Sequence, residues 1–279
     1  MKLQERDFAV LAALERWGVM GLGQVDGMLF HKEVIGEERA RLFFNEVRRE
    51  DYWGRAYKRL SGLEKLGLVR VRRFPYSWPV YMLTGQGFEL LQRRGKTRFD
   101  APRQGVSDRL VRHEVAVVGV GLVLTQVLGC PVNTARETWG WMSKQYGRDN
   151  QKARLTMPDL LTENMGGKME HIIEVELTPK SRKRYQDIFD SHTKRLPNYQ
   201  TSKILYLVGW PGGVAQITGL AHKYETSSVY AASLSTFRAT LGRCEFAPSY
   251  PRNYAPFTLT AKSEQTPEAL RHAEQEVSR

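Results

Sequence analysis

Two carboxylates stand close together on one predicted strand of this chain. The stretch HIIEVEL, residues 171–177, alternates apolar residues with Glu174 and Glu176. Side chains alternate across a strand, so both glutamates point to the same face. Like charges held this close repel each other, and a buried carboxylate is costly unless it is paired or binds a metal. The sequence therefore predicts that another group compensates the two glutamates.

A third carboxylate, Asp159, lies on the preceding predicted strand, LTMPDLLTE. The glycine-containing turn 164–167 joins the two strands, so a hairpin would bring Asp159 beside Glu174 and Glu176. Three converging carboxylates form a hard-oxygen site for Mg²⁺ or Mn²⁺. Such an ion would neutralise the repulsion, lower the pKa of a bound water and stabilise the charge on a cleaved phosphodiester. The pattern thus predicts metal-assisted hydrolysis of a nucleic acid.

An α+β fold with two domains is expected to position these groups. Residues 1–98 predict helices at 5–17 and 21–30, then a charged loop, a third helix at 55–69, a hairpin with its turn at 75–79, and a closing helix at 87–95. Gly18 and Gly67 are the expected stops of the first and third helices. Three helices, a hairpin and a closing helix make a winged helix-turn-helix. The stretch KRLSGLEKLGLVRVRR resembles the passage from recognition helix to wing in bacterial winged-helix proteins.

Positive charge favours a nucleic acid or an anionic membrane surface as the partner, and together with the winged-helix pattern of residues 1–98 it predicts double-stranded DNA. The chain has a net charge of +12 and a pI of about 9.7, and this region holds 19 Lys and Arg against 12 Asp and Glu. The start of the third helix is the end that enters a major groove, and phosphates would lie along the wing. The residues expected to bind DNA are Arg55, Tyr57, Lys58 and Arg59 on the helix and Arg70, Arg72 and Arg73 on the wing. A solvated basic face in a domain that contacts only protein is the alternative.

The second domain is expected to follow a linker at 99–109, which is rich in Gly, Pro and mixed charge. Residues 110–260 predict the order α-β-β-β-α-β-α-β, including a strand at 134–141 and a charged helix at 180–195. This order predicts a mixed α/β sandwich with its acidic strands in the centre. Trp139 and Trp141 are interpreted as residues that pack against the sheet. The polar tail 261–279 is either a short helix or disordered.

At its acidic residues the sequence resembles the PD-(D/E)XK nuclease superfamily. Pro158 and Asp159 supply the PD, and Glu174-Val175-Glu176 occupies the (D/E)XK place, with Glu176 where the motif has lysine. The resemblance implies a nuclease-like fold with Asp159, Glu174 and Glu176 as catalytic and metal-binding residues. Lys180, in the following TPKS, or a lysine elsewhere is the candidate for the missing positive group. Glu114 lies on the first helix of this domain, where many enzymes of this fold place an extra acidic ligand; a surface glutamate is the alternative.

Four further groups are weighed for the same site. His113 is a candidate ligand or general base, although a core histidine satisfied by a neighbour is the first interpretation. Glu137, in the predicted strand RETWGW, is a further candidate acid. The basic residues 182–184 would hold phosphate beside the metal or form a solvated helix face. Tyr199 is rejected as a covalent nucleophile, because no His-hydrophobe-His metal motif accompanies it.

A broader resemblance covers most of the chain. A winged helix, the triplet Arg112-His113-Glu114, the PD and EVELTPKS motifs, and KRLPNY before the strand ILYLV are similar to the replication-relaxation family. That family occurs on plasmids, integrative elements and phages and is related to mobilisation relaxases of nuclease fold. The resemblance implies DNA binding at an origin or transfer site, DNA nicking, and replication or mobilisation proteins as partners.

Two functional hypotheses follow. The first is a relaxase-like, Mg²⁺- or Mn²⁺-dependent nickase that hydrolyses DNA without a covalent intermediate. The alternative is a non-catalytic replication initiator or transcription regulator, in which a degenerate nuclease fold serves as a dimerisation or effector module. No apolar run is long enough to span a bilayer and no signal peptide is recognised, so a cytoplasmic protein is expected. Two distant cysteines, Cys130 and Cys244, predict neither a disulfide framework nor a zinc site.

Overall fold

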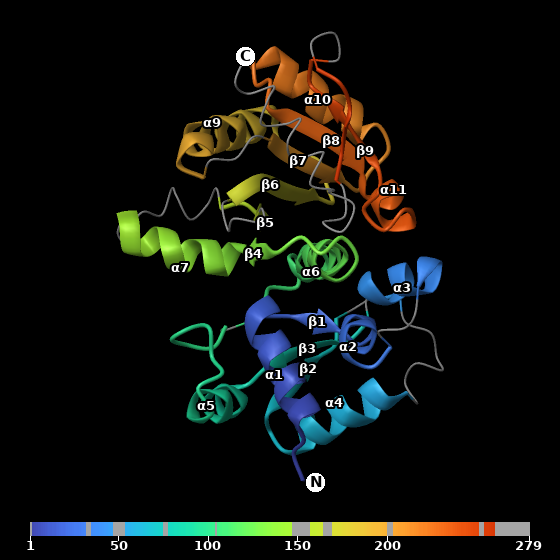
Figure 1. The fold of residues 1–279 in the computed structure, drawn as a ribbon, viewed down its shortest axis with the longest axis vertical. Helices are drawn as coiled ribbons and strands as arrows, with labels where there is room; N and C mark the ends of the chain where they lie inside the picture. The colour runs from blue at the N-terminus through green and yellow to red at the C-terminus, as the bar shows by residue number, and fades with distance from the viewer. Residues whose placement is uncertain are drawn as a thin grey trace, which may run out of the picture. The chain divides into compact units, whose positions relative to one another are not determined.

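The computed structural model divides into two compact units, residues 1–122 and 123–279 (Figure 1). It describes residues 2–31, 35–46, 54–74, 78–103, 105–146, 157–163, 169–199, 203–250 and 254–259. The chain is a mixed α+β protein, with a largely helical region and a seven-stranded mixed sheet. In the described part of the chain, no helix combines the length and apolar character needed to cross a membrane.

The border between the units lies inside one helix, α6 (Val111–Gln126). The expected domain bounds, with a linker at 99–109, stay predictions, because a compact unit is defined by its contacts and not by independent folding. The tail 261–279, the expected turn at 164–167 and residues 75–77 of the expected turn at 75–79 lie outside the described residues.

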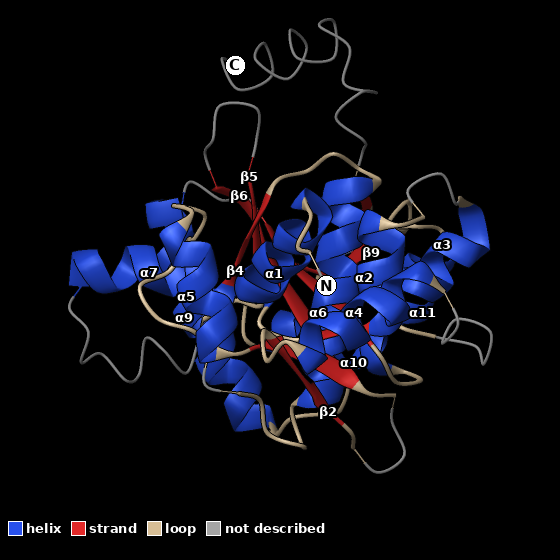
Figure 2. Cartoon of the chain, turned by 90° about the horizontal axis from the view of Figure 1, so that it is seen from below, coloured by secondary structure: helices blue, strands red, loops and turns tan. Residues whose placement is uncertain are grey.

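Helices make up most of the regular structure of the first unit (Figure 2). Its strands are two to four residues long. Its sheet has the order β1-β3-β2, with β3 antiparallel to both neighbours. The elements before α6 are, in order, α1 (Glu5–Trp17), β1 (Met20–Gly21), α2 (Leu22–Leu29), α3 (Gly36–Phe43), α4 (Arg55–Lys65), β2 (Val69–Arg72), β3 (Val80–Leu83) and α5 (Gly85–Arg93).

Local sequence sets the ends of these helices as predicted. Gln4 and Asp7 form a capping box at the start of α1, with the Gln4 N–H donating to the Asp7 carboxylate at 2.6 Å. Gly18 ends α1 with a positive φ of 77°, and Gly67, at φ 70°, follows α4. Positive φ is a conformation that glycine adopts without a Cβ penalty, so both stops could be predicted from the residue type.

Helix α3 lies in a segment that the sequence predicted to be a charged loop. Gly23 and Gly27 lie one turn apart on α2, and a Cβ on Gly23 would come within 2.8 Å of the Leu42 carbonyl oxygen. The two glycines therefore allow α3 to approach α2 closely, and Leu42 and Phe43 are buried there. The prediction of a loop was wrong because this packing against α2 stabilises a helix whose own sequence, GEERARLF, is mostly polar.

The second unit is built on a seven-stranded sheet of order β10-β9-β8-β7-β6-β5-β4. Strands β4, β5 and β6 form an antiparallel meander, β6, β7 and β8 are parallel, and β8, β9 and β10 are antiparallel. Beyond α6 the elements are β4 (Val132–Thr134), α7 (Ala135–Tyr146), β5 (Leu160–Glu163), β6 (Met169–Glu176), α9 (Arg182–Tyr199), β7 (Lys203–Val208), α10 (Gly213–Lys223), β8 (Val229–Ser233), α11 (Leu234–Ala239), β9 (Glu245–Pro248) and β10 (Phe257–Thr258).

The predicted strand at 134–141 was wrong beyond Thr134. Residues 135–146 form α7, so Trp139 and Trp141 lie on a helix and not on the sheet. The Glu137 carboxylate accepts from the Thr134 N–H at 2.8 Å, and the Glu137 N–H donates to the Thr134 hydroxyl at 3.2 Å. This reciprocal capping box fixes a helix start at TARE, and it overrides the strand preference of the aromatic residues.

One face of the sheet packs against α9 and α10, which lie together on the same side (Figure 1). Helix α9 contributes the buried residues Tyr185, Ile188 and Phe189, at helical spacing. The sheet contributes alternate residues of its interior strands: Leu161 of β5, Ile172 of β6, Ile204, Tyr206 and Val208 of β7, and Val229 and Ala231 of β8. Glu174 and Glu176 alternate in step with Ile172, so the two acids face this α-helical layer.

Candidate metal centre

Asp159 lies opposite Glu174 across two adjacent strands. Leu160 of β5 pairs with Ile173 of β6 in antiparallel register, so one further step places Asp159 opposite Glu174. The Asp159 Oδ2 atom accepts a hydrogen bond from the backbone N–H of Val175 at 2.8 Å, which fixes this carboxylate at the start of β5. The hairpin therefore brings together Asp159 and Glu174, as the sequence predicted.

Glu174 is buried, with 6 % of its surface exposed, and it is paired with a histidine from α9. The Glu174 Oε1 atom lies 2.6 Å from His192 Nε2, and His192 is fully buried. Burial raises the pKa of Glu174, the nearby Asp159 carboxylate raises it further, and the hydrogen bond from His192 opposes both effects. Part of the compensation predicted for the acid pair is thus supplied by a histidine.

Glu176 is compensated separately, by an ion pair with Lys180. The Lys180 backbone N–H donates to the Tyr185 hydroxyl at 3.1 Å, which ties the segment before α9 to the helix itself. Burial lowers the pKa of the Lys180 amine, and the carboxylates of Glu174 and Asp159 act in the opposite direction. Lys180 therefore belongs to the same electrostatic cluster as Asp159 and Glu174.

Tyr206 extends the row of polar groups across a third strand. It pairs with Glu174 in the parallel register of β6 and β7, and it is fully buried. Burial and the neighbouring carboxylates hold the pKa of the Tyr206 hydroxyl well above its usual range. Within the described residues, the Tyr206 hydroxyl and His192 Nδ1 are buried without a hydrogen-bond partner. Such atoms mark places where water or an ion completes the hydrogen bonding.

The donor set fits Mg²⁺ or Mn²⁺ held by two carboxylates. Over the described ranges, no three His, Cys, Asp or Glu side chains form a group that could hold a metal ion. Because the Lys180 amine forms an ion pair with Glu176, the expected set of three metal-binding carboxylates is reduced to Asp159 and Glu174. Mg²⁺ is usually bound through one or two carboxylates, with waters and substrate phosphate oxygens as the other ligands. Asp159 and Glu174 therefore provide the number of carboxylates that such a site uses.

Glu114, the expected extra ligand, is engaged in the first unit. Both of its carboxylate oxygens accept from the Arg103 guanidinium, at 2.9 and 2.5 Å. His113 is half-buried beside it on α6. Glu137, the further candidate acid, forms the capping box at the start of α7. These residues have structural partners, and the structure gives no positive sign that they bind metal.

The predicted DNA-binding residues divide into two groups. Arg59 forms a bidentate ion pair with the fully buried Asp7 of α1, and Arg72 binds the Val106 carbonyl at 2.7 Å and the Asp108 carboxylate at 2.8 Å. Tyr57 is half-buried and Arg70 is exposed. Arg55, Lys58 and Arg73 are exposed, and in the described part of the chain they have no side-chain partner. These three cations are the best placed to contact a phosphate.

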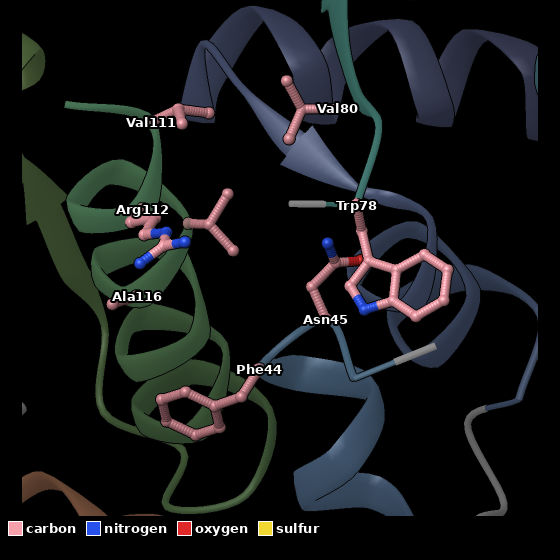
Figure 3. Close-up of a pocket in the computed structure, with 8 residues that line it drawn as sticks. Phe44, Asn45, Trp78, Val80, Val111, Arg112 and Ala116 are labelled. Carbon is pink, nitrogen blue, oxygen red and sulfur yellow. The ribbon is translucent and has the colours of Figure 1, made fainter. Parts of the chain in front are cut away.

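The first unit also contains a pocket of about 260 Å³ beside α6 (Figure 3). Its walls are mostly apolar, and none of the residues expected to bind metal or DNA lines it. Arg112, from the Arg-His-Glu triplet, contributes one wall, and Asn45 lies between α6 and Trp78 in Figure 3. The lining residues are Phe44, Asn45, Trp78, Val80, Val111, Arg112, Val115 and Ala116.

Comparison with known proteins gives no match to any protein family, curated sequence or solved structure.

Sequence reasoning missed His192 and Tyr206. Tyr206 lies in an apolar run, ILYLV, that predicts only a buried strand. His192 lies three and four residues after Phe189 and Ile188, on the buried stripe of α9. A histidine within an apolar stripe, opposite a strand that carries two acids, is the signal that could have identified the pair.

Proposed function

We propose that this chain is a DNA-binding protein that nicks DNA by metal-dependent hydrolysis at an origin or transfer site of a mobile element. The observation that carries the proposal is the placement of Asp159 directly opposite Glu174, with the Lys180 amine in the same electrostatic cluster. Two carboxylates and an amine are the groups that a divalent cation and a phosphodiester require. Replication or mobilisation proteins are the partners proposed for such an activity.

Each residue of the cluster has a role in this mechanism. Asp159 and Glu174 would hold Mg²⁺ or Mn²⁺, which supplies Lewis acidity for phosphodiester hydrolysis when bound. The Lys180 amine would neutralise charge that develops on the phosphate, in the role of the lysine that the motif lacks. Glu176 would keep Lys180 in place through their ion pair. The resemblance to PD-(D/E)XK nucleases agrees with these roles.

The first unit supports DNA binding by a winged helix. The succession α1-β1-α2-α4-β2-β3, with a three-stranded sheet of order β1-β3-β2, is compatible with that fold once α3 is treated as an insertion. The exposed cations Arg55 and Lys58 lie in the first turn of α4, the helix proposed to enter the major groove. Arg73, just beyond β2, is available to a phosphate beside the wing.

The nicking activity is tested with supercoiled plasmid carrying DNA from beside the protein's own gene. We expect Mg²⁺ or Mn²⁺ to support conversion to open circles by the wild-type protein, and Asp159→Asn to abolish it, because the variant loses one of two metal-binding carboxylates. Asp187→Asn, which neutralises an exposed carboxylate on α9, is the matched control and should retain activity. Equal nicking by wild type and Asp159→Asn would show that the activity lies elsewhere or in a contaminant.

DNA affinity is tested separately, through its dependence on salt. Replacing Arg55 and Lys58 together by Ala should weaken DNA binding and flatten the log–log slope against salt by up to about two units, because each phosphate contact releases counterions. Fluorescence anisotropy over a salt series measures both quantities. A double variant at the exposed Arg93 and Lys223 matches the loss of net charge and should leave the slope unchanged. If both double variants behave alike, net charge and not α4 is responsible for binding.

A non-catalytic DNA-binding protein is the second candidate, and one observation favours it. Glu176 is 3 % exposed and neutralised by Lys180, so one of the three acids is already compensated by the protein itself. Calorimetric titration with Mn²⁺ separates the two functions. Binding that is lost in Asp159→Asn supports the nuclease, whereas no binding at millimolar Mn²⁺ supports a replication initiator or regulator with a degenerate nuclease fold.

A further inference from the structure

The buried pair of Glu174 and His192 has a feature that packing alone does not explain. Their side chains are 8 % and 0 % exposed, and a 2.6 Å hydrogen bond joins Glu174 Oε1 and His192 Nε2. The other ring nitrogen, Nδ1, is buried without a partner in the described part of the chain. A buried polar atom without a partner destabilises a fold, and an apolar residue at 192 would avoid that cost.

The position of His192 on α9 also indicates that packing alone does not explain this residue. Tyr185, Ile188 and Phe189 precede it on the buried stripe of the helix and pack against the sheet. An apolar side chain at 192 would continue that stripe. It would, however, leave the Glu174 carboxylate without a hydrogen bond from any residue that the structure describes. The main contribution of His192 is therefore its hydrogen bond to Glu174, and not its packing against the sheet.

The two oxygens of Glu174 are used unequally. Oε1 is held by His192, and no hydrogen bond to Oε2 is found among the described residues. Asp159 lies opposite, with its own Oδ2 held by the Val175 N–H. Glu174 is thus fixed through one oxygen, and its second oxygen is the one placed to bind another ligand.

We propose that His192 is a positioning residue that fixes Glu174 through Oε1 and so presents Oε2, together with Asp159, to a divalent cation. This inference rests on the proposed metal site. Carboxylates that bind metals are commonly held by such outer hydrogen bonds, and losing one of them weakens metal affinity by about 10- to 100-fold. His192 itself does not contact the cation or the DNA in this arrangement.

The test compares two amide variants of the full-length chain by Mn²⁺ calorimetry without DNA. The amide nitrogen of Gln reaches the place of Nε2, whereas that of Asn reaches only the place of Nδ1, which has no partner. We expect His192→Gln to keep Mn²⁺ affinity within about threefold of wild type, and His192→Asn to lose about 10- to 100-fold. A purely structural histidine would make both variants bind Mn²⁺ equally, since neither amide replaces the ring, and that result would overturn the proposal.

A measurement on the wild-type protein covers the case in which either variant fails to fold. In protein labelled with ¹⁵N-histidine, Mg²⁺ should shift the ring signals of His192 and leave those of the exposed His222 unchanged. Unchanged His192 signals, in protein that binds Mg²⁺, would contradict the positioning role while leaving the proposed function intact. If wild-type protein binds neither Mn²⁺ nor Mg²⁺, the nuclease function fails and the role of His192 fails with it.

Discussion

Between pH 7 and pH 5, the His171→Phe variant is expected to lose about 2 kcal/mol less unfolding free energy than the wild-type protein. His171 is buried on β6, and its ring meets Phe257 edge-on with centroids 5.1 Å apart. Burial, followed by the positive charge of Lys203, lowers the pKa of His171 from 6.5 to about 3. Phe retains an aromatic ring in this contact and does not titrate.

The sign of the effect follows from proton binding. Below pH 6.5 the unfolded chain protonates His171, whereas the folded chain does so only near pH 3. The stability that comes from this residue is therefore complete above pH 6.5 and declines by about 1.4 kcal/mol per unit as the pH falls towards 3. Glu170 lies 3.8 Å from the His171 ring and Lys203 is near it, so other charges also affect the pH dependence of stability. The test therefore compares the change in unfolding free energy of the variant with that of the wild type.

Urea unfolding at pH 7 and pH 5 measures the expected difference. His222→Gln is the control, because His222 is exposed, and it should show the same decline in unfolding free energy as the wild type. If His171→Phe also declines as steeply as the wild type, His171 does not carry the acid sensitivity.

Arg59→Met is expected to destabilise the first unit by about 3 kcal/mol. The substitution leaves the Asp7 carboxylate, which is 0 % exposed, without its bidentate partner. The estimate is at the low end for a buried ion pair, because the Arg59 side chain is 21 % exposed and Asp7 keeps its bond from the Gln4 N–H. Chemical denaturation gives the change in unfolding free energy.

Two further variants define the cause of that loss. Arg55→Met removes an exposed cation from the same helix, and it should change stability by less than about 0.5 kcal/mol while lowering DNA affinity. The double variant Asp7→Asn/Arg59→Met removes both charges, and it should be more stable than Arg59→Met alone. If the double variant is no more stable, the cost comes from lost packing of Arg59 and not from an unpaired carboxylate.

Features that depend on neighbouring residues could be predicted from the sequence. The bounds of α1, its stop at Gly18 and the stop of α4 at Gly67 follow from side-chain spacing and from glycine at positive φ. Glu174 opposite Asp159 follows from strand alternation and a short turn. By contrast, the helix at 135–146 was missed because the TARE capping box was not recognised before an aromatic-rich run.

Features that depend on distant residues could not be predicted in this way. The partner of Arg59 is 52 residues away, so an exposed arginine and one held in an ion pair look the same in the sequence. His192 meets Glu174 only because α9 crosses back over β6 before entering β7 in parallel. Helix α3 forms by packing against two glycines of α2. In each case the deciding contact joins two elements that the local pattern describes separately.

The connection from β5 through β6 and α9 to β7 has an evolutionary consequence. The polar side chains of the candidate metal centre all come from this single stretch of chain: Asp159, Glu174, Glu176, Lys180, His192 and Tyr206. Strands β8, β9 and β10 extend the sheet on one side without contributing to the cluster. Insertions, losses or recombination among those later strands can therefore reshape the border of the protein, while the residues of the proposed metal site are inherited together.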